Sequence, residues 1–118
     1  MSEILRVYHN ARCSKGRAAC ALLQERGLAL EVVEYLKTPP SRAELAGLLR
    51  KLGATAESLV RKGEDIYKSD YQGRELDEEA WLDALVAHPI LIERPIVVRG
   101  ERAVVARPPE KVLSLLQG

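Results

Sequence analysis

Apolar residues recur along the first third of the chain with two different periods, and each period predicts a different element. Short apolar runs at residues 4–8 and 30–35 predict β-strands. Between them, residues 14–26 have the spacing of an amphipathic helix, which Gly27 would end. A strand, a helix and a second strand in succession are typical of a right-handed βαβ unit with two parallel strands.

The middle of the chain, about residues 41–88, has only the helical period. Ser41, with a glutamate three residues later, is a capping box that predicts a helix start, and Gly53 predicts the end of that helix. Two further helices are expected, one over residues 56–62 and one after Asp77. This stretch is therefore predicted to be a helical insert.

The last third of the chain returns to a strand pattern. Residues 95–98 and 103–105 predict two strands, and the loop between them is so short that they must be antiparallel. A final helix is expected after Pro108 and Pro109. The order β-α-β, helical insert, β-β-α predicts an α/β protein with a mixed four-stranded sheet, the layout of the thioredoxin/glutaredoxin-like fold. We expect one such domain over residues 1–118.

The composition limits the possible functions. With 118 residues, 47% of them hydrophobic and 30% charged, the chain is typical of a single globular domain. A net charge of +1 gives no general attraction to nucleic acid or to a membrane surface, and one Trp and four Tyr are too few for a base-stacking platform. The start lacks the pattern of a signal peptide. We therefore expect a cytoplasmic protein with reduced cysteines. We also expect no bound cofactor and no metal.

Cys13 lies where the first predicted strand passes into the first predicted helix. Backbone N–H groups are unpaired at a helix N-terminus and the helix dipole favours negative charge there, so both effects stabilise a thiolate. Arg12, Lys15 and Arg17 add positive charge, which also suits an arriving anion. The alternative is a free cysteine that serves as a small buried hydrophobe. The polar neighbours of Cys13 favour a reactive thiol.

Cys13 has no resolving thiol beside it, because Gly16 stands where a C-x-x-C motif would have its second cysteine. Cys20 is about 10 Å further along the predicted helix, which is beyond disulfide reach. We expect Cys20 to be a core residue of that helix. A reaction at Cys13 would then need an external thiol, such as glutathione or a small redox protein.

Three neighbours of Cys13 have alternative interpretations. His9 would either lower the thiol pKa from four residues upstream or be a loop histidine with no role. Asn10 is expected to stabilise the loop through its side chain. Arg17, one helical turn after Cys13, would contact an oxyanion or be an ordinary solvated arginine.

Several motifs in collinear order resemble those of the glutaredoxin-dependent arsenate reductases. The first is His-x3-Cys-x3-Arg, present as His9, Cys13 and Arg17. The others are YLKTPP at residues 35–40, LVRK at 59–62, HPILIERPIVV at 88–98 and ARPPE at 106–110. The resemblance covers nearly the whole chain, and the Cys-Ser-Lys-x-Arg sequence is similar to one branch of the family.

The resemblance implies a role for particular residues. It assigns the nucleophile to Cys13 and three oxyanion-binding arginines to Arg61, Arg94 and Arg107. Guanidinium groups suit this task because they bind tetrahedral oxyanions bidentately and stay charged. The alternative for each arginine alone is a surface charge.

Ser14 and Pro95 belong to the same motifs, and we expect them to support the site. In this fold the peptide bond before the third strand is typically cis and faces the cysteine, which makes Arg94–Pro95 the candidate. Residues 69–74 depart from the family pattern, and this departure bears on partner docking more than on chemistry.

The function implied by the resemblance is reduction of arsenate to arsenite at Cys13, with glutathione as co-substrate and glutaredoxin as partner. One alternative is a glutathione-linked thiol reductase or transferase that acts on another substrate. Another is a redox-sensing transcription regulator of the same fold, although such proteins usually carry the C-x-x-C motif that Gly16 removes.

Overall fold

The computed structural model describes residues 4–9 and 14–116, and the chain divides into two compact units. The first unit combines the two ends of the chain, Met1–Thr38 and Arg94–Gly118. The second unit is the continuous stretch Pro39–Glu93, which includes the predicted helical insert. Within the described ranges, no helix has the length and apolar character that crossing a membrane requires.

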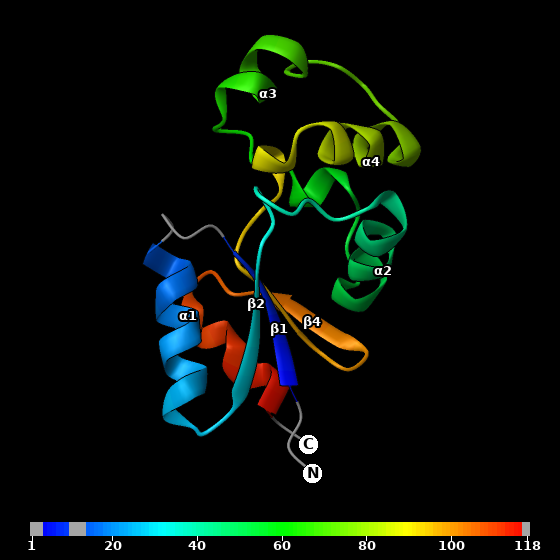
Figure 1. Ribbon diagram of the computed structural model, residues 1–118. Helices are drawn as coiled ribbons and strands as arrows, with labels where there is room; N and C mark the ends of the chain where they lie inside the picture. Colours follow the sequence, from blue (N-terminus) through cyan, green and yellow to red (C-terminus); the bar gives the residue numbers. More distant parts are fainter. Residues whose placement is uncertain (1–3, 10–13, 117–118) are drawn as a thin grey trace. The chain divides into compact units, whose positions relative to one another are not determined.

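The first unit contains a four-stranded sheet in the order β2-β1-β3-β4 (Figure 1). The strands are β1 (Ile4–His9), β2 (Ala29–Glu34), β3 (Ile96–Arg99) and β4 (Arg102–Val105). β1 pairs with β2 in parallel, whereas β3 pairs antiparallel with both β1 and β4. This confirms the predicted α/β class and the mixed sheet of a thioredoxin-like fold.

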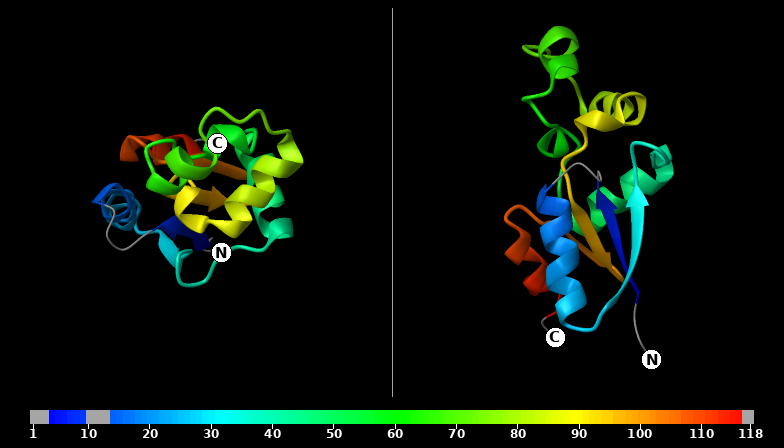
Figure 2. Two further views of the ribbon diagram at one scale, coloured as in Figure 1. Left: turned by 90° about the horizontal axis from the view of Figure 1, so that it is seen from above. Right: turned by 60° about the vertical axis from the view of Figure 1, so that its left-hand side comes forward.

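Two helical elements, α1 (Ser14–Glu25) and the 3-10 helix η3 (Pro109–Leu116), pack against each other on one face of this sheet (Figure 2). The expected final helix is therefore present, but with 3-10 geometry. The apolar side chains buried between these helices and the strands form the core of the unit: Leu5, Val7, Ala19, Leu23, Val97, Ala106, Val112 and Leu115. Alternation along β1 directs Leu5 and Val7 to this face.

Arginine side chains from β3 and β4 fix the end of η3. Arg99 Nη1 donates a hydrogen bond to the carbonyl oxygen of Leu115 at 2.7 Å, and Arg102 Nη2 donates one to the carbonyl oxygen of Ser114. The last carbonyls of a helix have no partner within it, so these bonds satisfy them. The C-terminal helix is thereby attached to the β3–β4 hairpin.

The second unit is helical. Its elements are α2 (Arg42–Leu52), η1 (Glu57–Leu59), α3 (Asp65–Asp70), α4 (Glu78–Ala87) and η2 (Pro89–Leu91). The predicted helix ends are confirmed: Ser41 Oγ accepts from Glu44 N at 3.1 Å, and Gly53 closes α2 with φ = 65°. Asp77 Oδ1 likewise caps α4 by accepting from Ala80 N at 2.8 Å.

The predicted helix over residues 56–62 is wrong. Only Glu57–Leu59 forms a single 3-10 turn. The chain then becomes extended, because Val60 pairs with Ile92 in an antiparallel bridge and the N–H of Arg61 donates to the carbonyl oxygen of Leu91 at 2.7 Å. A long-range backbone pairing has replaced the local helical hydrogen bonds here.

The single tryptophan organises the α3–α4 packing. Trp81 is buried, and the rings of Tyr67 and Tyr71 lie with their centroids 6.4 Å and 5.9 Å from it. The ring of His88 meets the ring of Tyr71 edge-on, with the two centroids 6.0 Å apart. The short helix α3 is held to α4 by these aromatic contacts, which add to simple area burial.

Two glycines, one inside α2 and one directly after it, provide a test of where this helix ends. Gly47 lies inside the helix, where a Cβ would meet Arg50 Nη2 at an ordinary 3.6 Å. Gly47→Ala should therefore stabilise the protein by about 0.5–1 kcal/mol, since alanine has the higher helix propensity. Gly53→Ala should destabilise it by about 1–2 kcal/mol, because alanine is strained at positive φ.

Urea unfolding followed by circular dichroism measures both changes in the free energy of unfolding. Each variant serves as the control for the other, because the same atom is added to the same helix in both. A shift of the same sign for the two variants would contradict the assignment of Gly53 as the left-handed end of α2.

Candidate active site

The strand register brings three separate parts of the chain to one end of the sheet. Tyr8 near the end of β1 pairs with Ile96 at the start of β3, and Ile96 pairs with Val105 at the end of β4. The chain leaves β1 at this end toward α1, enters β3 there from Arg94, and leaves β4 there toward Arg107. Two of the three predicted oxyanion-binding arginines therefore lie at the same end of the sheet as the end of β1.

Arg94 and Arg107 also contact each other. Arg107 Nη1 donates a hydrogen bond to the carbonyl oxygen of Arg94 at 3.3 Å, and Ala106 N donates to the carbonyl oxygen of Pro95 at 2.9 Å. Both arginines are half-buried, and the Nε and Nη1 atoms of Arg94 have no exposed surface. The Arg107 guanidinium thus lies against the backbone of Arg94, and positive side chains from both residues at this end of the sheet favour negative charge there.

The expected cis peptide bond between Arg94 and Pro95 is confirmed. A second cis bond joins Arg107 to Pro108, and the sequence analysis did not foresee it. Each of the two arginines thus directly precedes a cis proline at this end of the sheet.

His9 is the last residue of β1 and is buried, with 9% of its surface exposed. Its position in the strand shows that it is not a loop residue, and its predicted influence on the Cys13 thiol stays a prediction. The Nδ1 atom is buried and has no hydrogen-bond partner among the residues that the structure describes. A buried polar atom normally has a partner, so this nitrogen is an exception among the described residues.

Cys13 and Asn10 lie outside the described residues, and their predicted roles stay predictions. Helix α1 begins at Ser14, directly after Cys13, as the sequence predicted. Its first turn contains Lys15 and Arg17 and no acidic residue, which is the opposite of what the helix dipole favours. An anion at this N-terminus would offset the unfavourable arrangement. The side chain of Arg17 is exposed.

Arg61 belongs to the second unit, where two carboxylates surround it. Its Nη1 lies 2.9 Å from an Oε atom of Glu93, and its Nε lies 3.3 Å from an Oε atom of Glu64. The side chain is only 20% exposed. Sequence analysis missed both carboxylates, although Glu64 follows Arg61 by three residues, a spacing at which side chains on a turn can meet. No motif or spacing near Arg61 in the sequence predicted its contact with Glu93.

Cys20 is confirmed as a residue that packs against the core of the first unit. It is half-buried beside the cluster formed by α1, η3 and the sheet. Burial raises the pKa of the Cys20 thiol, because it disfavours the charged thiolate. Cys20 is thus suited to packing and poorly suited to nucleophilic chemistry at neutral pH.

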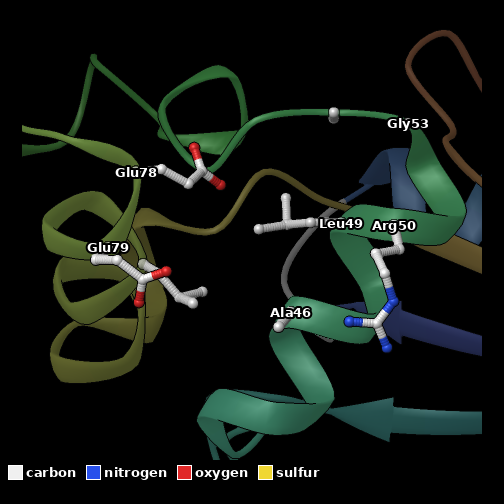
Figure 3. Close-up of a pocket in the computed structure, with 8 residues that line it drawn as sticks. Ala46, Leu49, Arg50, Gly53, Glu78 and Glu79 are labelled. Carbon is white, nitrogen blue, oxygen red and sulfur yellow. The ribbon is translucent and has the colours of Figure 1, made fainter.

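A surface pocket of about 340 Å³ in the second unit has none of the predicted site residues in its lining (Figure 3). It is lined by residues of α2 and of the start of α4, among them Leu49, Arg50 and Glu78. Both carboxylate oxygens of Glu78 accept from the N–H of Ala56, at 3.1 and 3.0 Å, so this side chain has a structural role. Within residues 4–9 and 14–116, no group of three or more His, Cys, Asp or Glu side chains could hold a metal ion.

Comparison with known proteins identifies the family. The chain matches the ArsC family over residues 8–115. It is 48% identical to an arsenate reductase of Neisseria meningitidis serogroup B, over 98% of this chain and 100% of that protein. It is 46% identical to the Escherichia coli (strain K12) protein YfgD, over 98% and 99% of the two chains.

A solved structure of an arsenate reductase from Vibrio cholerae has a TM-score of 0.92 to this structure. The two are 41% identical, and the match covers 97% of this chain and 98% of that chain. The protein therefore belongs to the ArsC family. The resemblance found in the sequence is thus confirmed at the level of the family.

The raised pKa of Cys20 leads to a prediction about its reactivity. In a Cys13→Ser variant, Cys20 is the remaining thiol, because the chain contains two cysteines. A raised pKa lowers the thiolate fraction at neutral pH, so iodoacetamide should modify Cys20 more slowly in the native protein than in urea. The difference should shrink as the pH rises through the native pKa.

Mass spectrometry at successive times measures these rates. The same variant in urea is the control, and glutathione under each condition corrects for the effect of urea on the reagent. Equal rates for native and unfolded protein at pH 7 would show that burial does not protect Cys20.

Proposed function

We propose that this protein is a cytoplasmic arsenate reductase in which the Cys13 thiolate attacks arsenate. Glutathione and a glutaredoxin supply the electrons as separate molecules, and no resident cofactor takes part. Family membership and the names of its similar relatives support arsenate as the substrate.

One observation in the structure carries the proposal. The half-buried Arg94 and Arg107 lie at the end of the sheet where β1 ends, and the next helix begins directly after Cys13. An oxyanion held by these guanidinium groups would be near the chain segment that contains the nucleophile. Guanidinium groups recognise the paired oxygens of a tetrahedral anion, and their charge stabilises a nearby thiolate.

The proposed reaction balances through two thiols. Cys13 Sγ forms a bond to arsenic while one As–O bond breaks and its oxygen leaves as water after protonation. The glutathione thiol next displaces a second oxygen from the same arsenic. A glutaredoxin thiolate then attacks the glutathione sulfur. The As–S bond pair stays on arsenic, which is reduced from As(V) to As(III), and glutathione and glutaredoxin leave as a mixed disulfide. Hydrolysis of the remaining As–S bond releases arsenite and returns Cys13.

Arsenate-dependent turnover tests this function directly. Purified protein with arsenate, glutathione, glutaredoxin and glutathione reductase should consume NADPH, and Cys13→Ser should abolish the consumption because a neutral hydroxyl is a far weaker nucleophile. Cys20→Ser is the matched control and should retain turnover, since Cys20 packs against the core. A folded wild-type protein that shows no arsenate-dependent NADPH consumption would refute the proposal and favour a different substrate.

The arginines at the end of the sheet should contribute through geometry as well as charge. Arg94→Lys keeps the charge but loses the two-pronged contact, so kcat/KM for arsenate should fall about ten- to a hundredfold, or about 1.5–3 kcal/mol. Arg94→Ala should be worse, and Arg107 should follow the same order. The same coupled assay measures the change.

Arg26→Lys is the matched control for these substitutions. Arg26 is exposed just after the end of α1, about 18 Å along the helix from the residue after Cys13. Its replacement should leave kcat/KM unchanged. If Arg94→Lys and Arg107→Lys were equally harmless, the end of the sheet would not be the oxyanion site.

A further inference from the structure

Residues 65–74, which we call the α3 segment, comprise the helix α3 and the turn that follows it. No residue of the helix itself is buried, and no side chain caps its N-terminus. So short a helix is marginal on its own, because few hydrogen bonds offset the entropy lost in forming its first turn. The segment lies on the side of α4 away from α2 (Figure 1). Its position therefore depends on its contacts with α4.

The hydrogen bonds of the α3 segment are local. Gln72 N donates to the carbonyl oxygen of Tyr67 at 2.8 Å. Arg74 Nη1 donates to the carbonyl oxygen of Asp70 at 3.2 Å. Among the described residues, no hydrogen bond or ion pair joins the segment to α2, to α4 or to the two 3-10 turns of the unit. The segment can thus leave α4 without breaking a hydrogen bond.

Aromatic rings hold the segment to α4, and they cover a polar atom that has no partner. The rings of Tyr67 and Tyr71 pack on Trp81, which is only 3% exposed. Within residues 4–9 and 14–116, the buried indole Nε1 of Trp81 finds no hydrogen-bond acceptor. An indole nitrogen can only donate, and a buried donor without an acceptor costs free energy that contact with water would recover. Packing of the segment on Trp81 therefore carries a cost that its detachment removes.

The rest of the second unit is tied together by polar contacts that do not involve the α3 segment. Arg42 Nε donates to Asp83 Oδ1 at 3.0 Å and so joins α2 to α4. Both carboxylate oxygens of Glu78 accept from Ala56 N, which joins the start of α4 to the chain after α2. These contacts stay intact when the segment moves.

We propose that the α3 segment detaches from Trp81 as one body while the rest of the second unit stays folded. Detachment exposes the Trp81 ring and hydrates its N–H, and the internal hydrogen bonds of the segment are kept. Segments with few buried contacts open in this way at a lower free energy than global unfolding requires. This conformational change is separate from the proposed reaction and does not depend on it.

Hydrogen exchange of the Trp81 indole N–H tests the proposal in the unmodified protein, where the single tryptophan gives one NMR signal. Its protection factor, relative to the urea-unfolded chain, should be at least about tenfold lower than that of the buried Leu85 backbone amide inside α4. Urea below the unfolding transition should hardly change the indole rate, since detachment exposes little surface, but it should accelerate exchange at Leu85. Equal protection and equal urea dependence would overturn the proposal, because water would then reach the indole only when α4 unfolds.

Tyr71→Leu tests the role of the aromatic contact. Loss of the ring should lower the indole protection factor about three- to tenfold and leave the Leu85 amide unchanged. Tyr71→Phe is the matched control: it keeps the ring, and the Tyr71 hydroxyl makes no hydrogen bond to a described residue, so the indole should exchange as in the wild type. An unchanged indole in Tyr71→Leu, or an equal loss of protection at the indole and at Leu85, would contradict detachment of the α3 segment alone. If Tyr71→Leu does not fold, the comparison within the wild type decides.

Discussion

The pairing of β1 with β3 is the constraint on which the candidate site depends. Antiparallel register sets Tyr8 opposite Ile96, so the end of β1 and the start of β3 share one end of the sheet. A slip of one residue would turn every side chain of β3 to the other face and remove Val97 from the core against α1 and η3. The burial of β3 therefore fixes where Arg94 lies, and core packing and site geometry have the same cause.

Local patterns in the sequence were enough to predict most of the fold. Strands and helices follow from apolar spacing, and Ser41, Gly53 and Asp77 mark helix ends through interactions confined to a few neighbouring residues. The extended stretch at Val60 could not be predicted in this way, because its hydrogen bonds are to residues about thirty positions away. Tertiary pairing overrode a locally plausible helix.

The candidate site shows the same division between local and long-range information. The motifs indicated which arginines would bind an oxyanion. The strand register explains why Arg94 and Arg107 lie at the same end of the sheet. The environment of Arg61 was not predictable, since its contact with Glu93 depends on the bridge that the sequence did not reveal. The Arg61 guanidinium lies between two carboxylates, whereas the Arg107 guanidinium donates to the backbone carbonyl oxygen of Arg94. The three arginines therefore have different electrostatic surroundings, although the motif treats them alike.

Arginine geometry alone does not distinguish arsenate from phosphate, because both are tetrahedral oxyanions of the same charge type. In the proposed reaction the distinction arises from the chemistry at sulfur. A thiolate can displace oxygen from As(V), and a second thiol can then reduce it to As(III), whereas thiols do not reduce phosphate. Phosphate bound at the same guanidinium groups would therefore occupy the site without turning over. The fold needs only to hold an oxyanion beside a stabilised thiolate, and the choice of product follows from the element that the oxyanion contains.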